Sequence, residues 1–150
     1  MTPEKIKLVQ ESFKKVEPIA SQAADIFYAR LFEIAPQVRS MFPEQMGDQK
    51  MKLMGMLGTA VNNLHQVETI IPAVQDLGRK HVAYGVTADH YKPVGEALIY
   101  TLEKGLGDDF TAEVKDAWLT TYTTLQDVMV AAAAEVEPPQ KKGFFARMFG

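Results

Sequence analysis

The feature that most constrains this chain is an apolar residue at every third or fourth position, with prolines interrupting the pattern. Ile6, Val9, Phe13 and Val16 follow this spacing, which places their side chains on one face of an α-helix. Pro18 ends the pattern, and the same periodicity then starts again. No segment shows the two-residue alternation that is typical of a β-strand. The sequence therefore predicts an all-α protein.

Seven helices are expected from the periodic segments and their breaks. Their ranges are 3–16, 19–35, 36–42, 48–67, 72–83, 89–104 and 111–132. Thr2, Asp48 and Thr111 are expected N-caps, and the sixth helix is expected to be capped by Thr87 or Asp89. A short oxygen-bearing side chain can accept a backbone N–H at the start of a helix. Gly85 is the expected C-cap after the fifth helix, since glycine readily adopts the left-handed backbone there.

Two glycines lie inside the expected helix over 48–67, at Gly55 and Gly58. Glycine in a helix interior costs up to about 1 kcal/mol relative to alanine. Such a cost suggests that another backbone, or a flat ligand, comes close to this helix.

Composition excludes several classes of function. The chain has 150 residues and a net charge of −3, which argues against a nucleic-acid-binding surface. It has no cysteine, so disulfides, thiolate metal sites and iron–sulfur clusters are excluded, and a reducing cytoplasm is the expected location. There is no apolar run of about 20 residues and no signal-like start, so no transmembrane segment is expected.

Composition changes near residue 135. Residues 1–135 are expected to form one domain, and 136–150 a proline-containing linker followed by a basic, aromatic tail. Phe144, Phe145 and Lys142 are typical of this tail. Two interpretations remain open for it: an amphipathic contact with a membrane or a partner, and a disordered end.

The chain has three histidines, so any metal site that uses histidine must involve His65, His81 or His90. His81 follows Leu77 by four residues and therefore shares its apolar helix face. From position alone it is either a core histidine that bonds backbone carbonyls or a ligand.

Several short motifs occur in one order along the chain and together carry a family resemblance. They are Pro36 with Phe42 six residues later, Leu77–His81 with Tyr84–Val86, His90–Leu98, Leu102–Gly107, Phe110–Thr111 and Ala117–Trp118. Over about residues 2–134 the chain resembles the single-domain globins of bacteria and neuroglobin. The resemblance implies a globin fold, with about seven helices in a three-over-three arrangement around haem.

The resemblance also implies how the haem is held. His81 aligns with the proximal residue that binds the iron, with its second ring nitrogen bonded to the carbonyl of Leu77. The cofactor is expected to be non-covalent haem b. Its apolar contacts are expected to be Phe42, Leu53, Leu77, Val86, Tyr91 and Val94. Lys52 is expected to meet a propionate, with Lys50 and Arg79 as alternatives.

On the opposite side of the haem, Gln49 aligns with the distal position, where neuroglobin has a histidine. Tyr28 aligns with a position that faces the bound gas. A tyrosine hydroxyl and a glutamine amide can both donate to a ligand that carries partial negative charge. The alternative is a core Tyr28 bonded to a carbonyl, with Gln49 exposed. Since His65 lies too far along the helix, the sixth iron position is expected to be open, water-filled or blocked by Tyr28.

The resemblance implies a protein that reversibly binds dioxygen, carbon monoxide and nitric oxide, as in oxygen transport. One alternative is a nitric oxide dioxygenase that depends on a separate reductase, since a chain of this length has no room for a reductase domain. Others are a haem-based gas or redox sensor and a haem-free helical adaptor.

Overall fold

The computed structural model of this protein describes residues 1–83 and 85–135, and within them every regular element is a helix. Tyr84 and the expected linker and tail over 136–150 lie outside the described residues. The six α-helices are α1 (Pro3–Val16), α2 (Ala20–Ile34), α3 (Gly47–Asn62), α4 (Ile71–Ala83), α5 (Tyr91–Leu106) and α6 (Ala112–Ala133). The short 3-10 helices are η1 (Glu17–Ile19), η2 (Pro36–Met41), η3 (Leu64–Thr69), η4 (Ala88–His90) and η5 (Gly107–Asp109). The seven expected helices correspond to the six α-helices and η2.

Local chemistry explains several of these boundaries. The side chain of Thr2 accepts the N–H of Lys5 at 3.2 Å, and that of Thr111 accepts the N–H of Val114 at 3.2 Å. Both expected N-caps are therefore confirmed. Gly85 has a φ of 90°, a left-handed conformation that glycine reaches without a steric cost, so the expected C-cap after α4 is also confirmed.

The expected helix over 48–67 differs at both of its ends. It begins one residue earlier, at Gly47, with Met46 as an N-cap that makes no side-chain cap bond, so the expectation for Asp48 was wrong. It stops at Asn62, because the side chain of Asn63 bonds the carbonyl of Thr59 at 2.7 Å and the backbone turns into η3. Asparagine favours such ends, since its amide competes with the backbone for hydrogen bonds.

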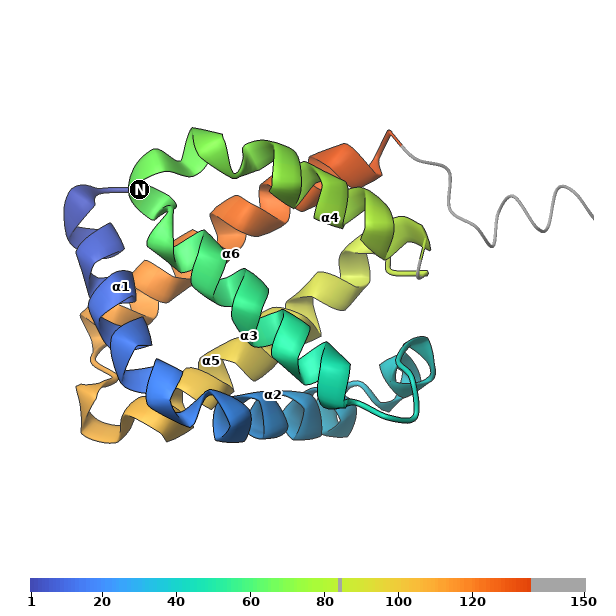
Figure 1. Cartoon of the computed structure of the whole chain (residues 1–150), viewed down its shortest axis with the longest axis horizontal. Coiled ribbons are helices and arrows are strands. Elements are labelled where there is room, and N and C mark those ends of the chain that lie inside the picture. The colour runs from blue at the N-terminus through green and yellow to red at the C-terminus, as the bar shows by residue number, and fades with distance from the viewer. Residues whose placement is uncertain (84, 136–150) are drawn as a thin grey trace, which may run out of the picture.

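The helices pack as two groups of three. Figure 1 shows α3 crossing in front of α5 and α6, while α4 runs along one edge. The closest pairings are α4 with α6, α2 with α5 and α1 with α6. In the same view α3 and α4 diverge from η3 in a V, so the start of α3 and the end of α4 lie at the same end of the molecule (Figure 1). This arrangement confirms the expected three-over-three layering.

The main core cluster is built by α1, α2, α5 and α6 with the last turns of α3. Trp118 lies at its centre with no exposed surface, and its indole N–H donates to the hydroxyl of Ser12 at 2.8 Å. That hydroxyl in turn donates to the carbonyl of Leu8 at 2.7 Å, so the buried polar groups are satisfied. No residue of α4 belongs to this cluster.

Close backbone approach occurs at a glycine that the sequence analysis did not single out. A Cβ on Gly78 of α4 would lie 2.5 Å from the carbonyl oxygen of Met129 on α6. For α3 the expectation of a close backbone was wrong, while that of a flat ligand stays a prediction: a Cβ on Gly55 would meet nothing within 4 Å, and one on Gly58 would meet only the ring of Phe13, at 3.5 Å. Among the described residues, no helix is both long and apolar enough to cross a membrane.

Candidate functional site

His81 lies in the last turn of α4 and is partly buried. Its Nδ1 is 2.6 Å from the carbonyl oxygen of Leu77, one turn earlier. Because a carbonyl can only accept, Nδ1 carries the proton and Nε2 carries the ring's lone pair. Burial lowers the pKa of His81, and the bond to Leu77 opposes that shift. The imidazole is therefore neutral at neutral pH, which is the form that binds metals.

Tyr91, the first residue of α5, lies beside His81, with ring centroids 6.2 Å apart. It is only 6% exposed, and its hydroxyl has no hydrogen-bond partner within the described part of the chain. Burial raises the pKa of Tyr91. The hydroxyl of Tyr122 donates to the backbone carbonyl of Tyr91 at 2.6 Å, which anchors α6 to the start of α5. A buried polar atom without a partner is costly, so this place suits a bound group.

Tyr28 and Gln49 come together across α2 and α3. The amide Nε2 of Gln49 donates to the hydroxyl oxygen of Tyr28 at 3.4 Å, and Tyr28 is only 4% exposed. Burial raises the pKa of Tyr28 and the bond from Gln49 opposes this, so the hydroxyl stays protonated at neutral pH. No acceptor for that proton is found among the described residues. The tyrosine therefore keeps a donor available in a largely dry place.

Aromatic rings surround Tyr28. The rings of Phe27 and Phe42 both meet it edge-on, with centroids 5.0 Å and 5.5 Å away. Phe32 packs on both Tyr28 and Phe42, at 5.9 Å and 5.5 Å. These contacts bring Phe42, which follows η2, against the residue expected to face the gas.

Arg39 is a residue that the sequence analysis missed. Its guanidinium donates to the carbonyls of Phe42, Pro43 and Glu44 at 3.1–3.3 Å and lies 5.1 Å from the centre of the Phe32 ring. It thereby fixes the loop that leads from η2 into α3. A lone arginine in a short turn carries no sequence signal for this role, because its partners are backbone carbonyls.

The remaining expected site residues lie on the same helices or beside them. Leu53, Leu77, Val86 and Val94 are partly buried, and Lys52 is exposed on α3. His65 is exposed on η3, and His90 accepts the backbone N–H of Thr87 at 2.9 Å. The described residues contain no group of three or more histidines and carboxylates that could hold a metal ion by themselves.

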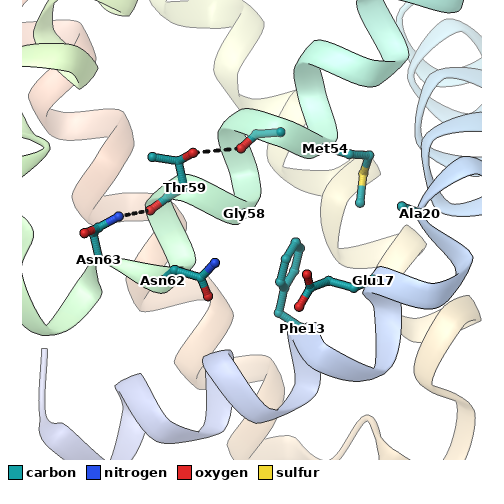
Figure 2. Close-up of a pocket in the computed structure, with 9 residues that line it drawn as sticks. Phe13, Glu17, Ala20, Met54, Gly58, Thr59, Asn62 and Asn63 are labelled. Atoms are coloured by element: carbon teal, nitrogen blue, oxygen red, sulfur yellow. Dashed lines mark hydrogen bonds between the residues drawn. The ribbon is translucent and has the colours of Figure 1, made fainter.

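A separate hollow of about 500 Å³ lies between the end of α1 and α3. Figure 2 shows the ring of Phe13 facing Gly58 there, with Glu17 and Met54 beside it and Asn62 further along α3. None of the expected site residues lines this hollow. It is therefore distinct from the groups around His81 and Tyr28.

Comparison with known proteins decides the family. The globin family model matches residues 25–129. The chain belongs to the globin family. This globin is 30% identical over 147 residues to neuroglobin-1 of Oncorhynchus mykiss, covering 88% of this chain and 89% of the relative. It is also 28% identical over 133 residues to a flavohemoprotein of Bordetella parapertussis, and it spans 33% of that protein's length.

Solved structures confirm the fold. A bacterial globin from Campylobacter jejuni superposes with a TM-score of 0.80 at 21% identity, covering 89% of this chain and 97% of that one. An engineered carbene transferase, a variant of a Rhodothermus marinus protein named for nitric oxide dioxygenase, gives 0.78 at 23% identity, with 100% and 99% covered. Globin membership implies a protein that binds haem and diatomic gases.

Proposed function

We propose that this globin holds haem b without a covalent bond and binds dioxygen reversibly. In this proposal His81 binds the iron, while Tyr28 and Gln49 donate to the gas on the other side. Haem supplies ferrous iron, to which a diatomic gas can bind. Oxygen transport and a cytoplasmic location are parts of the same proposal.

The residues around His81 fit a haem. Because Nδ1 of His81 donates a hydrogen bond to the carbonyl of Leu77, we assign iron binding to Nε2. The bond also fixes the orientation of the ring and raises its basicity. The unpartnered hydroxyl of Tyr91 lies next to this ring, where a bound group would complete its surroundings.

Partly buried apolar side chains would form the walls. Phe42 and Leu53 would pack against the macrocycle from the Tyr28 side, and Leu77, Val86 and Val94 from the His81 side. Lys52 is exposed on α3, where its ammonium group could pair with a propionate at the water boundary.

One observation carries the proposed gas binding: a buried Tyr28 hydroxyl that keeps its own proton while it accepts the amide of Gln49 at 3.4 Å. A hydroxyl that accepts from one donor becomes a stronger donor itself. In a pocket of low dielectric, such a donor stabilises a ligand with partial negative charge more than it could in water. Carbon monoxide and nitric oxide carry less charge when bound, so they gain less from the tyrosine.

The test is oxygen release from the Tyr28→Phe variant, measured by stopped flow on the haem-loaded protein. A charge-assisted hydrogen bond is worth about 1.5–3 kcal/mol. Since about 1.36 kcal/mol corresponds to a tenfold change in rate, loss of this hydrogen bond should speed oxygen release roughly ten- to a hundredfold.

Tyr100→Phe is the matched control, because Tyr100 lies on α5 between Arg30 and Lys104 and is not among the hydrogen-bond or ring partners of Tyr28 within the described residues. Its release rate should equal that of the wild type. An unchanged rate in Tyr28→Phe would remove the tyrosine from oxygen binding.

A second function is supported by the flavohemoprotein relatives and by the structure named for nitric oxide dioxygenase. In that reaction nitric oxide and dioxygen combine to nitrate, and one electron per turnover must return the iron to the ferrous state. The chain spans 33% of the length of the flavohemoprotein relative. We propose that a reductase supplies this electron. Multiple-turnover nitrate production that depends on added reductase would support this function. If each haem produced nitrate only once under all conditions, oxygen binding would remain as the one proposed function.

A further inference from the structure

Two polar contacts join α2 and α3 at one place. Lys50 lies 2.9 Å from the carboxylate of Asp25, and the neighbouring Gln49 bonds Tyr28 at 3.4 Å. Asp25 and Tyr28 are three residues apart on α2, so they lie on the same face of that helix. Two consecutive residues of α3 therefore meet one side of α2, Gln49 through its bond to Tyr28 and Lys50 through its ion pair with Asp25.

The first turn of α3 has no side-chain cap to hold it in place. Its N-cap, Met46, makes no side-chain cap bond, and a Cβ on Gly47 would meet nothing within 4 Å. A helix end without a cap leaves several N–H groups unsatisfied and frays easily. The position of Gln49 therefore depends strongly on tertiary contacts. Lys50 makes a charged contact of this kind, its ion pair with Asp25. The side chain of Lys50 is 34% exposed and that of Asp25 is 59% exposed.

We infer that the ion pair between Asp25 and Lys50 positions Gln49 against Tyr28 and thereby slows oxygen release. This inference rests on the proposed donor roles of Tyr28 and Gln49. Their bond is already long, at 3.4 Å, and hydrogen bonds weaken steeply beyond about 3.5 Å. A movement of the first turn of α3 by a few tenths of an ångström is enough to break it. Asp25 and Lys50 are thus positioning residues that act through Gln49.

The experiment measures oxygen release from haem-loaded variants in which the pair is broken, Lys50→Met and Asp25→Asn. Partly exposed ion pairs are worth little, so each variant should release oxygen about two- to fivefold faster than the wild type. About 1 M salt should speed the wild type to the same rate and leave both variants unchanged, because salt screens exposed charges. The carbon–oxygen stretch of the carbon monoxide complex should shift in both variants, since it reports the donors that face the gas.

Charge reversal separates positioning from general damage to the helix. The double variant Asp25→Lys with Lys50→Asp restores the pair with opposite signs and should return release to within about twofold of the wild type. Lys15→Met is the matched control, because it removes an ion pair of 3.1 Å with Asp109 that joins α1 to η5 and touches neither α2 nor α3. Its release rate and carbon monoxide stretch should not change.

Two results would overturn the inference. If Tyr28→Phe speeds release but Lys50→Met and Asp25→Asn do not, the ion pair has no positioning role, while the proposed oxygen binding stands. If Tyr28→Phe leaves oxygen release unchanged, the donors do not affect release. The ion pair then cannot act through them, and both proposals fail.

Discussion

Two chemically identical substitutions, Gly78→Ala and Gly55→Ala, should change stability in opposite directions. Both glycines lie inside α-helices and neither has a positive φ, so alanine fits the backbone at both positions. Helix propensity alone predicts a gain of about 0.8–1.0 kcal/mol for each. The difference lies in what the added methyl group would meet.

At Gly78 the methyl carbon would lie 2.5 Å from the carbonyl oxygen of Met129 and 2.8 Å from its Cα. To reach an ordinary carbon–carbon separation of about 3.5–4.0 Å, α4 would have to move roughly 0.7–1.2 Å away from α6. Overpacking costs about 1–3 kcal/mol, and no side-chain rotation can relieve a collision between backbones. After the propensity gain is subtracted from the middle of that range, we expect a net loss of about 1 kcal/mol.

At Gly55 a methyl carbon would meet nothing within 4 Å, so the full gain of about 1 kcal/mol should remain. Urea unfolding of the haem-loaded variants, followed by circular dichroism, measures both changes on one scale. The two variants should differ by about 2 kcal/mol. Gly78→Ala as stable as Gly55→Ala would refute the close approach of α4 and α6.

Three further predictions address other contacts. Ser12→Ala leaves the buried indole N–H of Trp118 without its acceptor at 2.8 Å, so urea unfolding should show a loss of about 1–3 kcal/mol. Burial, with Tyr91 adding to it, raises the pKa of Tyr122 far above 10. Above pH 10 the unfolded chain therefore releases a proton that the folded protein keeps, and stability should fall by up to about 1.4 kcal/mol per pH unit, less steeply in Tyr122→Phe. Arg39→Met loses three bonds to the loop before α3, so haem transfer to an acceptor globin should be about tenfold faster.

The helices could be predicted from the sequence because their causes are local. Apolar spacing, prolines and short oxygen-bearing side chains act within one or two turns, which is why the caps at Thr2 and Thr111 are confirmed. The start of α3 was misplaced because Met46 has no sequence signal for a cap, whereas Asp48 carries a strong one.

The site was less accessible to sequence reasoning, because its contacts join distant positions. No spacing rule pairs Tyr28 with Gln49, and that expectation came from the family resemblance. The ion pair between Asp25 and Lys50 and the approach of Gly78 to α6 depend on which helices cross, and a single sequence does not carry that information. A glycine inside a helix indicates that another backbone can come close. The sequence does not show at which glycine this happens.

The core and the proposed haem site meet at α2, because Tyr28 belongs to the main core cluster and Phe42, Leu53 and Val94 pack against it. The main core cluster draws on α1, α2, α3, α5 and α6, and includes no residue of α4, which carries His81. The apolar side chains proposed to contact haem are only partly buried by the protein itself. A flat apolar ligand would therefore remove their remaining surface from water, which stabilises the native state because an unfolded chain offers no such site. The scaffold around Trp118 is thus buried by the chain itself, whereas the proposed haem contacts would complete their burial only against the ligand.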